Sequence, residues 1–133
     1  VIGGEGNGGI IYPELHYGRD ALVGIALFLT HLAQSGTKTS LLKASYPNYT
    51  ISKNKIQLEE GMDVDGILRD IQAAYSNNEI DTTDGVKIYF EKEWVHLRKS
   101  NTEPIIRIYS ESESEEKANE LAHAIMDKIK ALA

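Results

Sequence analysis

Apolar and polar positions alternate along much of the second part of the chain, as they do in strands that bury one face. The stretches that we expect to be strands are residues 50–58, 86–91, 93–99 and 105–111. Two other stretches repeat apolar residues three, four and seven positions apart, which is the spacing of an amphipathic helix. The first is Val64, Ile67, Leu68, Ile71 and Tyr75, and the second is Ala118, Leu121, Ala122, Ile125, Met126 and Ile129.

Polar residues before these two helices predict where each one begins. Asp63 is the expected N-cap of the first helix, because its short carboxylate can accept from backbone N–H groups of the first turn. Ser112 is the expected N-cap of the second, with Glu115 completing a capping box. The order strand, helix, strands, helix predicts an α+β domain, in which two helices cover one face of a four-stranded, mainly antiparallel sheet.

The first part of the chain has a different pattern. Residues 21–33 form the expected helix there, begun by Asp20 and ended near Gly36, and they are apolar on nearly every side. A short helix over residues 39–45 must end before Pro47, since proline disfavours helical geometry in the residue that precedes it. We therefore expect an incomplete domain over residues 1–45, a linker over 46–49 and a complete domain over 50–133.

Composition excludes several classes of function. The formal net charge is −6, which argues against general binding to nucleic acid or to anionic membranes. There is no cysteine, so disulfides, thiolate catalysis and cysteine-based zinc sites are excluded. The four histidines show no metal-ligand spacing. No apolar run reaches membrane-spanning length, and the chain begins at Val1 without methionine and without the charged and apolar regions of a signal peptide. We therefore expect a cytoplasmic protein whose chain starts inside a domain.

The densest group of candidate binding residues lies between the last two expected strands. It combines cations, hydroxyls and an amide, namely Arg98, Lys99, Ser100, Asn101, Thr102 and Arg107. Arginine binds phosphate oxygens through paired charge-assisted hydrogen bonds, and hydroxyl and amide groups add neutral donors. Alternation places Arg98 and Arg107 on the face opposite their apolar neighbours, so that both guanidiniums converge outside the core. The alternative is an ordinary solvated turn.

Two motifs resemble those of one enzyme family. The string R-K-S-N-T-E-P-I-I-R at residues 98–107 is similar to the phosphate-binding loop R-x-S-N-T-x-P-x-x-R of the α-D-phosphohexomutases, which include phosphoglucomutase, phosphomannomutase and phosphoglucosamine mutase. The string G-G-E-G-N-G-G at residues 3–9 resembles the sugar-binding loop G-G-E-x-S-G-H of the third domain of the same family. Here Asn7 and Gly9 replace the usual serine and histidine.

The resemblance implies the carboxy-terminal part of such an enzyme, with a helical remnant of an α/β third domain before the fourth domain. The intact enzyme would interconvert sugar 1- and 6-phosphates through a phosphoserine with the help of Mg²⁺, most closely as a phosphoglucosamine mutase does. In this chain the substrate phosphate would contact Arg98, Ser100, Asn101, Thr102 and Arg107, and the sugar would contact Glu5 and Asn7.

The same resemblance places the nucleophile, the metal ligands and the general acid and base outside this chain. The implied partners are thus a phosphosugar and the rest of the enzyme, and we expect the fragment alone to bind no metal and to catalyse nothing. Other readings of the residues are a stand-alone phosphate-binding or protein-interaction module, or a dinucleotide loop at Gly4, Gly6 and Gly9. The dinucleotide loop fails because no helix follows it directly.

The pair Asp63 and Asp65 resembles part of a cation-binding loop, but the full D-G-D-x-D-R string of the family is absent. A helix cap at Asp63 and a favourable charge in the first helical turn at Asp65 explain both residues. We therefore expect them to be structural.

Overall fold

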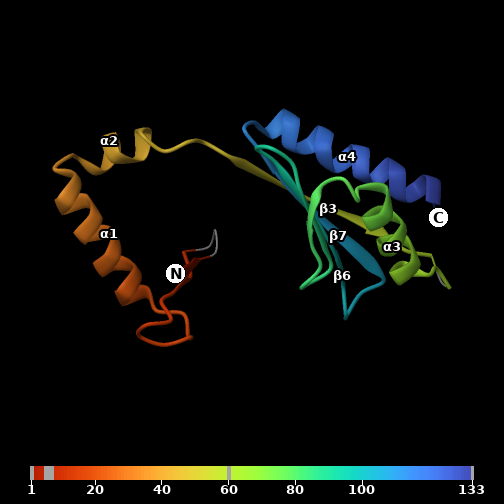
Figure 1. Ribbon diagram of the computed structural model, residues 1–133, viewed down its shortest axis with the longest axis horizontal. Helices are drawn as coiled ribbons and strands as arrows, with labels where there is room; N and C mark the ends of the chain where they lie inside the picture. Colours follow the sequence, from red (N-terminus) through yellow and green to blue (C-terminus); the bar gives the residue numbers. More distant parts are fainter. Residues whose placement is uncertain (1, 5–7, 60, 133) are drawn as a thin grey trace. The chain divides into compact units, whose positions relative to one another are not determined.

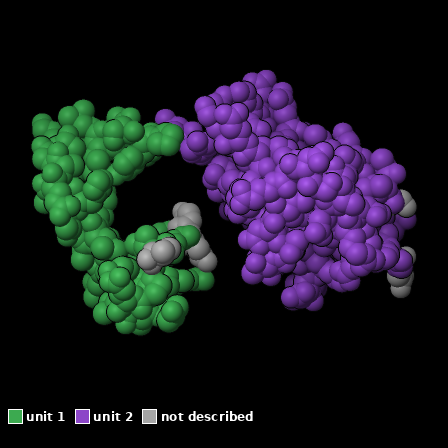
Figure 2. Space-filling model, viewed as in Figure 1, with its two compact units in different colours: residues 1–47 green, residues 48–133 purple. Residues whose placement is uncertain are grey.

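The computed structural model describes residues 2–4, 8–59 and 61–132 (Figure 1). The chain divides into two compact units, Val1–Pro47 and Asn48–Ala133, which Figure 2 shows in different colours. The second unit carries the expected phosphate loop, and the first carries the glycine-rich segment.

The second unit is an antiparallel sheet covered on one face by two helices, as the sequence pattern predicted (Figure 1). Its helices are α3 (Val64–Ala74) and α4 (Glu115–Leu132). Its strands are β3 (Thr50–Gln57), β4 (Glu79–Asp81), β5 (Val86–Tyr89), β6 (Trp94–Lys99) and β7 (Ile105–Ser112), in the spatial order β3-β7-β6-β5-β4. The last strand in sequence therefore lies between the first strand and β6.

The core of the second unit lies between the helices and one face of the sheet. Burial alternates along β6 and β7, as expected for strands with one covered face. The buried cluster joins residues from α3, α4 and the strands, among them Ile71, Ile88, Leu97, Ile108 and Ile125. The other face of the sheet, here called the open face, carries mainly polar and aromatic side chains.

The sheet has five strands, so the expectation of four was wrong. The additional strand is β4, which pairs with β5 at the edge of the sheet. It has three residues, and Ile80 is its single apolar one, between Glu79 and Asp81. Three residues are too few for an alternating pattern to be recognised in the sequence. Pairing with β5, and not a pattern of its own, makes it a strand.

The predicted start of the last helix was also wrong. Ser112 is the final residue of β7; it is fully buried, and its hydroxyl donates to Glu93 Oε1 at 2.6 Å. Ser114 caps α4 instead, since its Oγ accepts from the backbone N–H of Lys117 at 3.2 Å. The capping box between Ser112 and Glu115 therefore does not form.

The first unit contains β1 (Gly3–Gly4), β2 (Ile10–Ile11), α1 (Ala21–Ser35) and α2 (Thr39–Ala44), with β1 antiparallel to β2. Both predicted caps of α1 are confirmed: Asp20 accepts from the N–H of Val23, and Gly36 adopts the left-handed conformation with φ 62°. The helix has no buried residue, and Leu22, Ile25 and Leu29 are 77%, 55% and 54% exposed. An exposed apolar surface of this kind is typical of a face that packs against a partner.

The described helices include none with the length and apolar character needed to cross a membrane.

Candidate functional site

Arg98 and Arg107 are direct cross-strand partners in the pairing of β6 with β7. Side chains of directly opposed residues point to the same face of a sheet, so both guanidiniums lie on the open face. Their side chains are 54% and 43% exposed, and each can therefore reach a ligand from solvent. Two like charges in this position repel each other, which favours an anion between them.

The loop that joins β6 to β7 supplies short polar groups beside this pair. The backbone N–H of Ser100 donates to the carbonyl of Ile105 at 3.0 Å, which closes the loop at its base. Within the loop, the N–H of Thr102 donates to Ser100 Oγ at 3.4 Å, and the two hydroxyl oxygens are 3.5 Å apart. Asn101 and Thr102 are exposed. The loop thus presents two neighbouring hydroxyls and an amide to solvent.

The end of β3 anchors the far side of the same loop. The backbone N–H of Leu58 donates to the carbonyl of Pro104 at 2.8 Å, and Gln57 Nε2 donates to the same oxygen at 3.2 Å. A carbonyl that accepts two hydrogen bonds fixes the position of Pro104. The loop is therefore held at both of its ends.

Carboxylates lie close to both arginines of the pair. Asp84 Oδ2 is 3.2 Å from Nε of Arg98, and Glu103 Oε2 is 3.7 Å from an Nη atom of Arg107. Contact at Nε leaves the terminal nitrogens of Arg98 available for an anion. Glu103, in contrast, approaches a terminal nitrogen that a phosphate would use, so a phosphate would compete with it.

The turn between β4 and β5 places Asp84. Gly85 there has φ 84°, and a Cβ on it would lie 2.2 Å from the carbonyl oxygen of Leu97, so the turn packs directly on the backbone of β6. His96 Nε2 lies 2.5 Å from the carbonyl oxygen of Asp84, which accepts from the Nε2–H tautomer. The Thr83 hydroxyl and N–H lower the pKa of Asp81 at the base of the turn. Sequence reasoning missed Asp84 because it missed β4.

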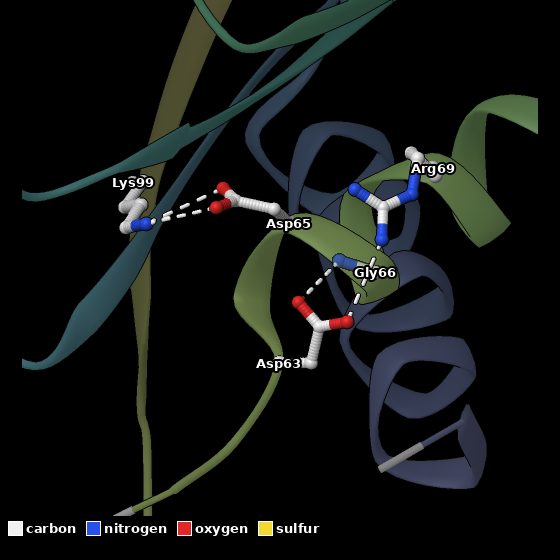
Figure 3. Close-up of polar contacts among 5 residues, drawn as sticks. All are labelled: Asp63, Asp65, Gly66, Arg69 and Lys99. Atoms are coloured by element: carbon white, nitrogen blue, oxygen red, sulfur yellow. Dashed lines mark hydrogen bonds and ion pairs between the residues drawn. The ribbon is translucent and has the colours of Figure 1, made fainter.

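Lys99 occupies a variable position of the loop motif and connects the loop to α3. Its Nζ lies 3.2 Å and 3.3 Å from the two carboxylate oxygens of Asp65 in the first turn of that helix (Figure 3). Asp63 caps the same helix by accepting from the N–H of Gly66 at 2.9 Å, and Arg69 lies 3.5 Å from its other oxygen (Figure 3). The structural roles predicted for Asp63 and Asp65 are confirmed.

Two hollows on the open face meet at Arg107 and Tyr109. The larger, of about 300 Å³, is also lined by Lys53, Lys55 and Glu103. The smaller, of about 50 Å³, is completed by His96 and Arg98. A third hollow of about 610 Å³ opens between the end of β3 and α4; Lys55, Met62, Met126 and Ile129 are among its lining residues, and neither arginine of the pair lines it. The convergent cations identify the first two as the candidate anion site.

The remaining predicted site residues, Glu5 and Asn7, lie outside the described residues, in the segment between β1 and β2. Within residues 2–4, 8–59 and 61–132, no three histidine or acidic side chains cluster closely enough to hold a metal ion.

Two family models match the chain in succession. Residues 1–49 match the alpha/beta/alpha domain III of phosphoglucomutase/phosphomannomutase, and residues 52–128 match the C-terminal domain of the same family. The described structure is also similar to the crystal structure of a phosphoglucomutase/phosphomannomutase family protein from Burkholderia thailandensis, with a TM-score of 0.66 and 23% identity over 98% of this chain and 28% of the other. That likeness concerns the fold.

Sequence relatives carry mutase names. The chain is 46% identical over 122 residues to a phosphoglucomutase/phosphomannomutase of Thermococcus kodakarensis, covering 90% of this chain and 26% of the relative. It is 39% identical over 127 residues to a phosphoglucosamine/phosphogalactosamine mutase of Sulfurisphaera tokodaii, covering 94% and 28%. A probable phosphoglucosamine mutase of Methanopyrus kandleri is 34% identical over 131 residues, covering 98% and 29%. The chain thus spans less than a third of the length of these relatives.

Proposed function

The chain belongs to the phosphoglucomutase/phosphomannomutase family, and we propose that it is the substrate-binding carboxy-terminal part of a phosphohexomutase. The whole enzyme would interconvert the 1-phosphate and 6-phosphate of a hexose or hexosamine. Phosphoglucosamine mutase is the member that we favour, since two of the relatives described above carry that activity in their names. We expect the enzyme to work in the cytoplasm.

The observation that carries the proposal is the direct cross-strand pairing of Arg98 with Arg107 beside a loop of hydroxyl and amide groups. A phosphate ester presents several oxygens, and two guanidiniums on one face can each bind two of them in a planar arrangement. Ser100, Asn101 and Thr102 would donate to the oxygens that remain. This group would hold the phosphate that is not being transferred.

Binding of this kind contributes to catalysis by orientation. An enzyme that fixes a remote phosphate positions the reacting end of the sugar, and well-oriented groups can supply several kcal/mol of the barrier reduction, roughly 7 to 11 in favourable cases. The reacting groups themselves, a phosphoserine and a bound Mg²⁺, would come from the part of the relatives that this chain does not span. The Mg²⁺ would stabilise the charge of the transferring phosphoryl group there.

Glu5 and Asn7 would bind hydroxyl or amino groups of the sugar. A carboxylate accepts hydrogen bonds from two hydroxyls or from an ammonium, and an amide can both donate and accept. These contacts would complement the phosphate contact made by the second unit. The alternative of a stand-alone module has less support, because two consecutive family models cover the chain in family order.

Titration of the 133-residue chain with inorganic phosphate, followed by ¹⁵N–¹H NMR, tests the proposal. We expect shifts concentrated at Ser100, Asn101 and Thr102, and loss of those shifts in Arg107→Ala. Affinity should be weak, since the charge-assisted hydrogen bonds contribute roughly 1.5 to 3 kcal/mol each before the entropy of binding is subtracted. Arg69→Ala on α3 is the matched control. Shifts spread evenly over the surface, unchanged in Arg107→Ala, would refute the assignment.

A further inference from the structure

Three cations form one row across three neighbouring strands of the open face. Lys55 of β3 is the register partner of Arg107 in β7, and Arg107 is the register partner of Arg98 in β6. Directly opposed residues share a face, so all three side chains leave the same side of the sheet. Lys55 lies far outside the loop motif in sequence, and only the strand order brings it here.

The row brings three like charges close together, and a bound anion would reduce the repulsion between them. Like charges directly opposite each other on neighbouring strands are destabilising. Arg98 and Arg107 each have a nearby carboxylate, but Lys55 forms no ion pair with any residue of the described ranges. Lys55 is therefore the one cation of the row without an ion-pair partner among the described residues.

Lys55 also lines the hollow into which an anion at Arg107 would fit. The hollow of about 300 Å³ is lined by Lys55, Arg107 and Tyr109. Arg107 and Tyr109 also line the smaller hollow, together with Arg98. The four-carbon stem of lysine is flexible and carries a compact charge with three donors. Its ammonium can therefore reach an oxygen bound at Arg107.

An ordinary explanation exists for lysine on β3, which is an edge strand of the sheet. Charged side chains on an edge prevent pairing with strands of other molecules. Lys53 fits this explanation, because its register partner is Tyr109 and its Nζ lies 5.6 Å from the centre of that ring. Two positions further along the strand, about 7 Å away, Lys55 instead faces an arginine. Protection of the edge does not require that placement.

We propose that Lys55 is a third cation of the phosphate site, and that the row formed by Lys55, Arg107 and Arg98 selects a doubly charged phosphate monoester. The inference rests on the proposed function, since it requires an anion at the arginine pair. A dianion gains from each added cation about twice what a singly charged group gains at the same distance. Lys55 is thus a residue that favours phosphate over carboxylate ligands.

The test measures the affinity of the 133-residue chain for inorganic phosphate at constant ionic strength, at a pH where the ion is mainly dianionic. Chemical shifts of Ser100, Asn101 and Thr102 report binding. We expect Lys55→Gln to weaken binding about three- to ten-fold, and Lys55→Arg to keep it within about two-fold, since a hydrogen-bonded cation is restored. Lys128→Gln removes the same charge from α4, at a position that lines neither hollow, and it should change affinity less than about two-fold.

Equal losses in Lys55→Gln and Lys128→Gln would show a general charge effect and overturn the inference, as would unchanged affinity in Lys55→Gln. Arg107→Ala separates this failure from failure of the proposed function. If Arg107→Ala abolishes binding while Lys55→Gln does not weaken it, only the role of Lys55 is refuted. If Arg107→Ala also binds normally, the phosphate site itself is refuted. Fluorescence of Trp94, the single tryptophan, verifies that each variant is folded.

Discussion

Asp84 contacts Arg98 at Nε and not at the terminal nitrogens, with 3.2 Å between Oδ2 and Nε. The contact restricts the guanidinium while its outer edge stays available to a ligand. Its contribution to fold stability is small, because both side chains are more than half exposed. Its effect should instead appear in ligand binding.

We therefore predict that Asp84→Ala binds phosphate about two- to five-fold more weakly than Asp84→Asn, because holding one long side chain in place is worth roughly 0.5 to 1.5 kcal/mol. Both variants lack the charge, and only the asparagine keeps an oxygen that can accept from Nε. The difference thus isolates orientation from charge. Isothermal titration or NMR titration with phosphate measures it, and equal affinities would mean that Asp84 does not orient Arg98.

In the full-length enzyme, Arg107→Lys should raise KM several-fold and lower kcat less. Lysine keeps the charge but cannot make the planar, two-point contact of a guanidinium with a phosphate remote from the reaction. Steady-state kinetics on a hexosamine phosphate and a hexose phosphate measures both constants. Arg69→Lys, on the exposed side of α3, is the control that should leave both unchanged; an identical result for Arg107→Lys would contradict the phosphate role.

Gly85→Ala should destabilise the second unit by roughly 2 to 4 kcal/mol, because a left-handed backbone disfavours a side chain and the added methyl meets the β6 backbone. The new Cβ would lie 2.2 Å from the carbonyl oxygen of Leu97. Gly61 separates the two causes, since it has φ 90° with nothing within 4 Å of its ideal Cβ. Gly61→Ala should cost only about 1 to 2 kcal/mol. Urea unfolding followed by Trp94 fluorescence measures the free energy of unfolding of both variants. Equal losses of stability would exclude a contribution from the contact with the β6 backbone.

The β4–β5 turn should loosen in acid. Hydrogen bonds from the Thr83 hydroxyl and N–H lower the pKa of Asp81, with Lys87 and His96 adding smaller effects. Because the pKa of Asp81 is lower in the folded state, its carboxylate stabilises the fold fully above the unfolded-state pKa of 3.8. This stabilisation is lost as pH falls through the folded-state pKa. Amide hydrogen exchange at Thr83 and Asp84 between pH 5 and 3 should report this, after correction for intrinsic rates. Asp81→Asn should show no such pH dependence.

Limited trypsin digestion should cut first at Lys38 or Lys43 and leave a stable product containing the second unit. That unit has its own buried core, whereas α1 in the first unit exposes Leu22, Ile25 and Leu29. The exposed apolar surface should also make the elution volume of the whole chain depend on its concentration. Rapid loss of residues 50–133 with survival of α1 would reverse the assignment of the independent domain.

The parts of this fold that depend on local pattern could be predicted from the sequence. Alternation around Arg98 and Arg107 was enough to place both side chains on the open face, and the caps at Asp20 and Asp63 follow from residue chemistry alone. Ser112 shows the limit. Two serines precede the last helix, and burial against Glu93, a tertiary contact, decides that Ser112 extends β7 while Ser114 caps the helix.

The extent of the proposed phosphate site depends on strand order, which no local pattern reveals. Lys55 and Asp84 flank the arginine pair only because β3 pairs with β7 and the β4–β5 turn packs on β6. Neither residue belongs to a motif. A sheet edge strand rich in lysine and a turn of the form D-T-T-D-G were the visible signals, but each has a common structural explanation.

The hydrogen bonds from Leu58 and Gln57 to the carbonyl of Pro104 link the loop between β6 and β7 to the end of β3. All eight residues of β3 pair with β7, and the strand starts two residues after Asn48, where the second unit begins. A strand bonded along its whole length resists stretching, so a pull applied where the chain enters this unit acts on the loop at the other end. A displacement of Asn48 would therefore be transmitted along β3 to the loop, while the strand pairing within the sheet stays the same.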